Sequence, residues 1–330
     1  VPWLYRDVQG TRAQWAGKLQ RFRSELLAER SEVEAASSAE DLVDSTKIRL
    51  GRHLSGLERF GEEVFGLLAP FALTHSEAGA TIPRDRVPSA QHVTSYLETA
   101  FRDWCWGEAE IRETMALVEP LLGDTKAGRV LVLGGGAGRF SWELSQRLPE
   151  AHVVQLDLNP LLTRIGSLVS SGETVELTEL PRFPVSVEDT VVHQSLDRPD
   201  DADGESPFYV LGDAFSAPFA PGSFDLLVTP WFVDVVPEAF SSLSRRLGGL
   251  LRDGGRWVSF GPLSFESQNV VGRHTPEEIV DLLEVAGFAV EAAGTEAVSY
   301  LHSPHGMARR GEEVFAFAAT RDGELRATDA

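Results

Sequence analysis

Hydrophobic positions follow two different spacings along the chain. In residues 1–122 apolar side chains recur near the 3.6-residue period of an amphipathic helix, which predicts helices over Gln14–Glu29, Ser45–Leu68 and about Ala90–Leu121. Residues Ser76–Ser89 interrupt this pattern with prolines among polar residues and are predicted to form a loop. Because no strand pattern is apparent here, we expect residues 1–122 to form a helical N-terminal cap region.

From Arg129 onward, short apolar runs alternate with amphipathic stretches. This pattern is typical of strands and crossover helices in a parallel sheet, so residues 123–330 are expected to form an α/β core. The last two of the seven predicted strands have no helix between them and should pair antiparallel at one edge. The predicted strands are Val130–Leu133, His152–Leu156, Phe208–Leu211, Phe224–Val228, Arg256–Phe260, Ala289–Glu296 and Val314–Ala319.

The stretch Ser170–Pro207 is too long for an ordinary crossover. Loops of this length usually form lids, binding loops or disordered segments, and we expect disorder in its acidic part, Asp197–Ser206.

A glycine-rich turn follows the first predicted strand and precedes a helix. Backbone N–H groups at such a helix start can receive the polar end of a ligand without obstruction by a Cβ atom. The run Gly134-Gly135-Gly136-Ala137-Gly138 has GxGxG spacing, whereas the dinucleotide fingerprint GxGxxG needs a glycine where Arg139 stands. The absence of GK[ST] after the glycines excludes a P-loop.

Acidic residues follow the next two strands. Asp157, followed by Leu158, stands roughly 20 residues after the glycine turn, where a carboxylate can accept hydrogen bonds from both ribose hydroxyls. Asp213-Ala214-Phe215 follows the third strand, where Asp213 can either accept from an adenine amino group or cap the next turn. Ligands of open α/β sheets bind at the carboxyl ends of the strands, so these features, with Thr229 after the fourth strand, predict an adenosine-type ligand.

Composition narrows the choice of partners. With 50 acidic and 30 basic residues the net charge is -20, which opposes binding to nucleic acid or to an anionic membrane surface. The single cysteine, Cys105, suits a reducing compartment, and the first residues lack the pattern of a signal peptide. We therefore expect a cytoplasmic protein that acts on a small molecule, with its oligomeric state left open.

These motifs resemble those of the seven-stranded S-adenosylmethionine-dependent methyltransferases over Leu121–Arg321, including the turn LRDGG at Leu251–Gly255. A narrower resemblance, to the carnosine N-methyltransferase family, rests on Phe101–Trp104, Trp231–Asp234 and Gly261–Leu263. The resemblance implies a Rossmann-like methyltransferase sheet with a helical N-terminal cap. It also implies S-adenosylmethionine as the cofactor, with S-adenosylhomocysteine as the product.

The resemblance also assigns roles to individual residues. Asp234 matches the family's catalytic aspartate, and Arg102 matches an arginine that contacts the cofactor, although an ion pair between Arg102 and Glu98 or Glu110 is an equal alternative. An imidazole, with a pKa of about 6.5, offers a free lone pair at neutral pH and needs only a carboxylate such as Asp234 to hold its other N–H. An alcohol would need a strong base or a metal, and we find no clustered ligand set for a metal.

The acceptor end departs from the family pattern. Phe265-Glu266 stands where the family has Tyr-His, and Arg309-Arg310 replaces expected tyrosines, so carnosine itself is in doubt and the arginines are candidates to receive a carboxylate. His302 and His305 are further candidates for substrate contact or base catalysis. We expect Trp104 and Trp106 to lie in the core. The complete set of candidate substrate contacts is Trp231, Phe232, Asp234, Phe265, Glu266, Tyr300, Arg309 and Arg310.

The sequence thus predicts an S-adenosylmethionine-dependent methyltransferase that modifies a nitrogen of a histidine-like small molecule or short peptide. Three alternatives stay open: O- or C-methylation of a specialised metabolite, a nicotinamide-dependent oxidoreductase, and a non-catalytic cofactor-binding partner.

Overall fold

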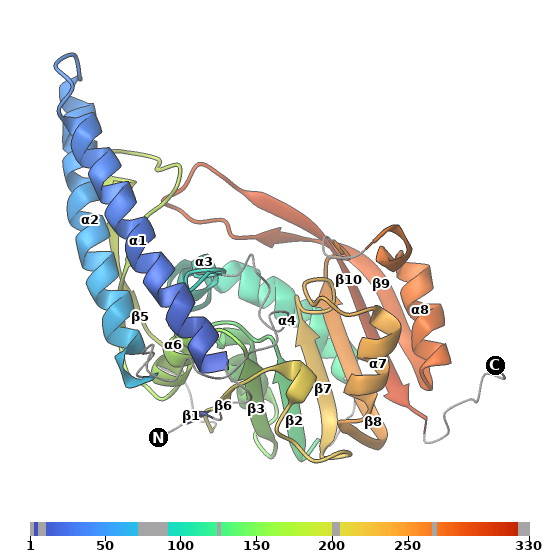
Figure 1. Cartoon of the computed structure of the whole chain (residues 1–330). Helices are drawn as coiled ribbons and strands as arrows, with labels where there is room; N and C mark the ends of the chain where they lie inside the picture. Colours follow the sequence, from blue (N-terminus) through green and yellow to red (C-terminus); the bar gives the residue numbers. More distant parts are fainter. Residues whose placement is uncertain are drawn as a thin grey trace.

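The computed structural model of the chain describes residues 3–5, 11–71, 92–123, 127–199, 205–265 and 269–322. Its main sheet has eight strands in the order β1-β6-β3-β2-β7-β8-β10-β9 (Figure 1). The strands are β1 (Trp3–Tyr5), β2 (Arg129–Leu133), β3 (His152–Asp157), β6 (Phe208–Leu211), β7 (Phe224–Pro230), β8 (Leu251–Gly261), β9 (Phe288–Tyr300) and β10 (Arg310–Arg321).

The seven strands predicted from the sequence are all present, and the α/β class is confirmed. Strands β6, β3, β2, β7 and β8 are parallel, and β10 pairs antiparallel with both β8 and β9, as expected for an edge without a crossover helix. The expectation of no strand in residues 1–122 is wrong, because β1 pairs in parallel with β6. A strand of three residues is too short to produce a readable alternation.

The helical predictions hold for the first two helices but not for the third. Helices α1 (Thr11–Ser37) and α2 (Asp44–Leu68) form a long hairpin whose far end projects beyond the sheet (Figure 1). The single helix expected over Ala90–Leu121 is instead divided into α3 (Glu98–Phe101), a π-helical turn η3 (Arg102–Trp106) and α4 (Glu108–Leu122).

Gly107 explains this division. Its N–H donates to the carbonyl of Arg102 at 2.8 Å, five residues back, and a Cβ atom at Gly107 would collide with that carbonyl. π turns inside α-helices occur frequently at functional sites.

The segment predicted as a long loop, Ser170–Pro207, contains a small antiparallel sheet, so that prediction is wrong in part. Strands β4 (Val175–Glu179) and β5 (Val192–Leu196) pair with each other, and β4 packs against α2 while β5 packs against the π turn η3. The Thr178 N–H donates to Glu63 of α2 at 2.6 Å. Residues 200–204, within the stretch expected to be disordered, lie outside the described residues.

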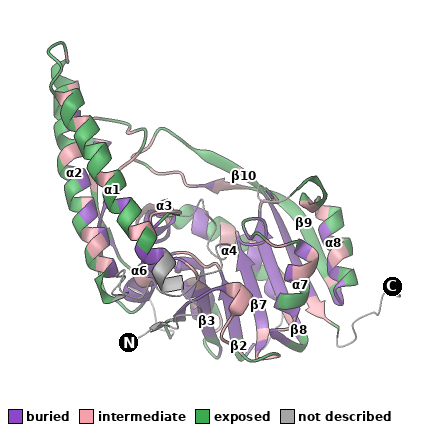
Figure 2. Ribbon diagram, in the orientation of Figure 1, coloured by how far each residue is buried: buried purple, intermediate pink, exposed green. Residues whose placement is uncertain are grey.

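Both faces of the central strands are buried, which accounts for their continuous apolar sequences (Figure 2). Helices α7 (Phe240–Gly248) and α8 (Pro276–Val285) share one core cluster with the sheet, and α4 and α5 (Arg139–Arg147) share another. A third cluster joins α1, α2 and α6 (Pro160–Ser170), so the cap region is packed onto the α/β core. In the part of the chain that the structure describes, no helix is long and apolar enough to cross a membrane.

The turn between β2 and α5 depends on Gly138. Its φ of +95° lies in the left-handed region, and a Cβ atom there would meet the Tyr209 hydroxyl oxygen. We expect Gly138→Ala to lower the free energy of unfolding by about 2–4 kcal/mol, measured by urea denaturation. The matched change Gly17→Ala, at an exposed site in α1 with open space around it, should raise it by about 0.5–1 kcal/mol. Equal effects at the two sites would contradict this explanation.

Candidate functional site

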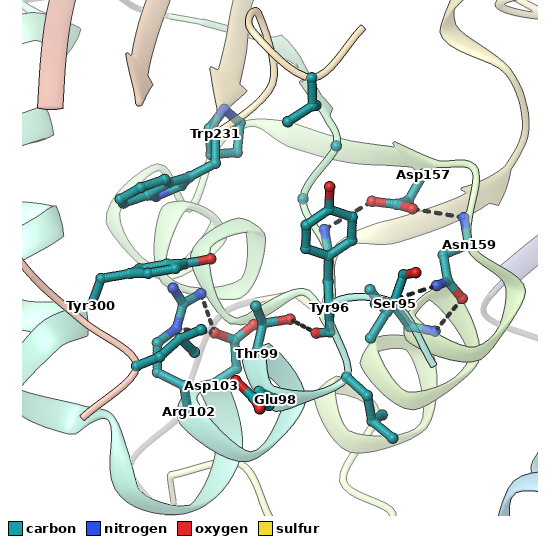
Figure 3. Close-up of a pocket in the computed structure, with 18 of the residues that line it drawn as sticks. Ser95, Tyr96, Glu98, Thr99, Arg102, Asp103, Asp157, Asn159, Trp231 and Tyr300 are labelled. Carbon is teal, nitrogen blue, oxygen red and sulfur yellow. Dashed lines mark hydrogen bonds and ion pairs between the residues drawn. The ribbon is translucent and has the colours of Figure 1, made fainter. Parts of the chain in front are cut away.

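A cavity of about 1020 Å³ lies at the carboxyl edge of the parallel strands, where the cap region meets the sheet (Figure 3). Its walls come from segments far apart in the sequence. They include residues 94–99 and 101–103 of the cap, the glycine turn at 134–136, the ends of β3, β6 and β7, residues 178–183 at and after the end of β4, and several residues between 300 and 312.

The glycine turn has the conformation that its sequence predicts. Gly134 and Gly136 have φ values of +71° and +58°, and a Cβ atom at Gly134 would lie 2.7 Å from the Phe232 ring. The Gly134 N–H donates to the Leu156 carbonyl at 2.9 Å, which fixes the turn to β3. Gly134, Gly135 and Gly136 all line the cavity, whereas Gly138 lies behind it at the start of α5.

Asp157 lies at the end of β3 and lines the cavity. Its carboxylate accepts the Gly136 N–H at 2.9 Å through Oδ2 and the Asn159 N–H at 2.8 Å through Oδ1. Burial raises the pKa of Asp157 to about 6, although the backbone hydrogen bonds oppose this shift. A carboxylate can accept about four hydrogen bonds, so Asp157 retains capacity for two ligand hydroxyls.

Asp213 has the capping role that the sequence left open. Its Oδ1 accepts the Phe215 N–H at 2.9 Å and caps the short 3-10 helix Ala214–Ser216, while the residue is only 3% exposed. Asp213, Ala214, Phe215 and Leu158 all line the cavity beside Asp157. This capping bond thus orients the Asp213 carboxyl group at the end of β6, the strand next to β3.

Arg102 pairs with its neighbour rather than with Glu98 or Glu110. Its Nε and Nη2 both donate to Oδ1 of Asp103, at 2.9 and 2.6 Å, and Asp103 is 2% exposed. The π turn makes this geometry possible by bringing both side chains to the cavity wall. A guanidinium carries five N–H donors, more than these two bonds use.

Arg139, which replaces the third glycine of the dinucleotide fingerprint, is buried and joins three elements. It donates to the Asp103 carbonyl at 3.0 Å, to Glu108 at 2.8 Å and to Glu143 at 2.9 Å. Its guanidinium also lies 5.7 Å from the centre of the Trp104 ring. Sequence reasoning identified Arg139 only as a missing glycine and did not predict this role.

An aromatic pair, Trp231 and Tyr300, forms part of the cavity wall. The Trp231 and Tyr300 rings are stacked, with centroids 4.3 Å apart and planes inclined by 22° (Figure 3). The Arg102 guanidinium lies 5.5 Å from the Tyr300 ring centre, and that of Arg310 lies 5.4 Å from it. Trp231 has a φ of +49°, and its N–H donates to the Phe260 carbonyl at 2.7 Å. Strained backbone of this kind persists where surrounding structure determines it, often at ligand sites.

Asp234 lies in the turn after β7 and lines the same cavity. It is 4% exposed, and its Oδ2 accepts the Ser264 N–H at 3.1 Å. The ring of Phe232, two residues earlier in the chain, packs against Gly134 of the glycine turn. The structure therefore brings Asp234, Asp157 and the aromatic pair to one cavity.

Most of the other predicted site residues lie outside the cavity wall. Thr229 is fully buried and accepts the Trp257 indole N–H at 2.9 Å, and Phe265 packs in the core against His274. His302 Nε2 lies 2.7 Å from the Arg310 carbonyl, and His305 Nδ1 lies 2.8 Å from Asp189 Oδ1. Arg309 is exposed, Arg310 lines the cavity but pairs with Glu312 at 2.8 Å, and Glu266 lies outside the described residues.

Several wall residues were not predicted from the sequence. Ser95, Tyr96 and Thr99 precede the π turn, and residues 178–183 form the end of β4 and the segment after it. Asn159, the N-cap of α6, also donates to the carbonyls of Val93 and Ser95 at 3.4 and 3.3 Å. The sequence Asn159-Pro160 is a recognisable helix start, but its contact with the cap region depends on tertiary packing.

The chain matches no family model and no curated protein. Its fold is similar to that of solved structures, one of which is a SAM-dependent methyltransferase from Methanosarcina mazei. That protein is 16% identical, the match covers 63% of this chain and 98% of that one, and the TM-score is 0.42.

A SAM-dependent methyltransferase from Thermotoga maritima, described as a possible histamine N-methyltransferase, is 14% identical over 70% of this chain and 96% of that one, with a TM-score of 0.41. The phosphoethanolamine N-methyltransferase 2 of Haemonchus contortus, solved with S-adenosylhomocysteine, is 14% identical over 64% of this chain and 52% of that one, with a TM-score of 0.42. At these levels of similarity, function is best inferred from the site itself.

Replacing Arg139 with methionine keeps most of its aliphatic volume but removes its hydrogen bonds to the cap. We expect Arg139→Met to lower the free energy of unfolding by about 2–4 kcal/mol, because carboxylates and the Asp103 carbonyl lose their donors. Urea denaturation measures this, with exposed Arg112→Met in α4 as the control, expected within about 0.5 kcal/mol of the unmodified protein. A decrease in the free energy of unfolding no larger than that of the control would contradict the role of Arg139 in holding the cap to the core.

Proposed function

We propose that this protein is an S-adenosylmethionine-dependent methyltransferase that acts on a ring nitrogen of an imidazole-bearing small molecule or short peptide. The observation that carries the proposal is a single cavity that combines the glycine turn, Asp157 and Asp213 at neighbouring strand ends, and the buried carboxylate of Asp234. The first three features suit an adenosine ligand, and the last suits a nitrogen nucleophile.

The cofactor end of the cavity fits S-adenosylmethionine by its donors and acceptors. Asp157 would accept the ribose hydroxyls, and Asp213 would accept the adenine amino group. The glycine turn leaves room beside its backbone for the amino-acid portion. The N–H donors of Arg102 that Asp103 does not use would receive the methionine carboxylate. When bound, the cofactor supplies a methyl group on a sulfonium centre.

The proposed acceptor follows from the charge that develops on it during methyl transfer. An imidazole nitrogen would use its lone pair to form a bond to the methyl carbon while the carbon–sulfur bond breaks, leaving S-adenosylhomocysteine. The ring becomes positively charged, and Asp234 would hold the N–H on its other nitrogen. Holding nucleophile and methyl group in line can contribute on the order of 7–11 kcal/mol to the lowering of the barrier.

The charge of the cavity supports an acceptor that gains positive charge. Among the residues that the structure describes, seven carboxyl side chains and three guanidinium groups line it, and two of those three, Arg102 and Arg310, are paired with carboxylates. The cavity is therefore less suited to binding a substrate carboxylate through Arg309 and Arg310 than the sequence suggested. The stacked rings of Trp231 and Tyr300 offer an aromatic face to a planar cationic ring.

The resemblance to the carnosine N-methyltransferase family supports an imidazole acceptor, and the departures at Phe265 and Arg309 favour an acceptor other than carnosine. The single cysteine supports a cytoplasmic location.

A methyl-transfer screen tests the proposal. The protein is incubated with S-adenosylmethionine carrying a 13C-labelled methyl group and, separately, with histidine, histamine, histidine-containing dipeptides, catechols and phenols. We expect a product from an imidazole, with the label on a ring nitrogen by NMR. Label on oxygen or carbon would overturn the assignment of an imidazole acceptor. Absence of transfer to every acceptor would overturn the assignment of methyltransferase activity.

Cofactor affinity should depend on the ionisation of Asp157. With its pKa at about 6, the carboxyl group is ionised at neutral pH and becomes protonated as the pH falls, which removes an acceptor for the ribose. We expect the affinity for S-adenosylhomocysteine to be constant above pH 7 and to fall about tenfold per pH unit below 6, measured by calorimetry. Asp157→Asn should bind weakly at every pH. Unchanged affinity of the unmodified protein between pH 7.5 and 5 would contradict the role of Asp157.

Asp234→Asn should impair turnover without impairing cofactor binding. Asparagine can still accept the Ser264 N–H but cannot stabilise the charge on the ring, so kcat should fall about 10²–10⁴-fold. Affinity for S-adenosylhomocysteine should change by less than about threefold, since the cofactor contacts remain. Asp281→Asn, at an exposed site in α8, is the control and should match the unmodified protein. An unchanged kcat in Asp234→Asn would remove Asp234 from the reaction.

A further inference from the structure

Tyr300 of the aromatic pair is followed directly by a turn with strained backbone. Leu301, directly after Tyr300 at the end of β9, has a φ of +56° although it is not glycine. An L-residue rarely adopts this conformation unless other contacts hold it. Tyr300 pairs with Arg310 of β10 on one side of the strand end, so the contact that holds Leu301 fixes the backbone directly after Tyr300.

That contact comes from Glu110 in α4. Its Oε2 accepts the Leu301 N–H at 2.9 Å, and its Oε1 accepts the His302 N–H at 2.7 Å. Glu110 is 7% exposed, so water cannot replace it freely. Hydrogen bonds from backbone N–H groups to an ionised carboxylate are short and about twice as strong as neutral ones.

A second buried carboxylate holds the next residue of the same turn. Glu179, at the end of β4, is 6% exposed and accepts the Ser303 hydroxyl at 2.9 Å and the Gln194 amide at 2.7 Å. Three consecutive residues, 301 to 303, are thus fastened to the cap region on one side and to the small sheet on the other. Glu110 is the member of this arrangement that binds the backbone next to Tyr300.

We infer that Glu110 is a positioning residue for the acceptor. It holds the Leu301 turn, the turn orients Tyr300 flat against Trp231, and the stacked pair forms the wall on which the acceptor ring lies. This inference rests on the proposed methyltransferase function. Tyr300 is not among the proposed cofactor contacts, and Arg102, which lies near Tyr300, is held by two hydrogen bonds to Asp103. Glu110 should therefore affect the acceptor much more than the cofactor.

Steady-state kinetics and calorimetry test this role, using the imidazole acceptor that the methyl-transfer screen identifies. Glutamine at position 110 can accept one N–H but presents an NH₂ group to the other. We expect Glu110→Gln to raise the acceptor KM about tenfold or more, with kcat and the affinity for S-adenosylhomocysteine each changed less than about threefold. Glu113→Gln, at an exposed position of the same helix, is the matched control and should have no effect.

A double-mutant cycle separates positioning from general damage. Tyr300→Leu removes the ring, so adding Glu110→Gln to it should change the acceptor KM by less than about twofold if Glu110 acts only through Tyr300. Additive effects of the two changes would overturn the inference, as would an unchanged KM in Glu110→Gln alone. Should Glu110→Gln fail to fold by thermal melting, Glu110→Asp keeps the charge, and it must also raise the acceptor KM selectively.

The experiments also distinguish a failure of the Glu110 role from a failure of the proposed function. A protein that transfers methyl groups to an imidazole but is unaffected by Glu110→Gln overturns only the role of Glu110. A protein that transfers no methyl group overturns the proposed function, and the role of Glu110 falls with it.

Discussion

The site depends on the attachment of the cap region to the glycine turn. Trp104 donates its indole N–H to the Ala137 carbonyl at 2.8 Å, and Arg139 donates to the carbonyl of Asp103. These two bonds join the π turn directly to the backbone that surrounds the ligand-binding glycines. Since Arg102 and Asp103 belong to that π turn, the cap supplies the charged pair in the cavity wall and does more than cover the sheet.

Buried and half-buried carboxylates accept hydrogen bonds from loops throughout this edge of the sheet. Asp157, Asp213, Glu110 and Glu179 each accept at least one backbone or side-chain hydrogen bond from a loop at the cavity wall or at its base. Burying a charge is unfavourable unless hydrogen bonds compensate it, so each carboxylate is stable only when its loop adopts one conformation. The same carboxylates therefore make the cavity acidic and hold its loops in one conformation.

The sequence predicted the parts of the fold that depend on local pattern. Apolar runs located all seven strands of the core, and the glycine spacing with Asp157 predicted the adenosine end of the cavity. The missing features do not follow from the pattern of apolar residues. The π turn at Arg102 follows from close packing between Gly107 and Arg102, and β4 pairs with β5 although apolar and polar residues alternate only over Val175–Thr178. His305 faces Asp189, 116 positions away, which no local pattern can reveal.

The central claim is that the cavity binds an S-adenosyl ligand and not a nicotinamide dinucleotide. Calorimetric titration of the purified protein with S-adenosylhomocysteine and, in parallel, with NADH tests it directly. We predict saturable binding of S-adenosylhomocysteine at one site per chain and no heat with NADH. Binding of NADH without binding of S-adenosylhomocysteine would contradict the account.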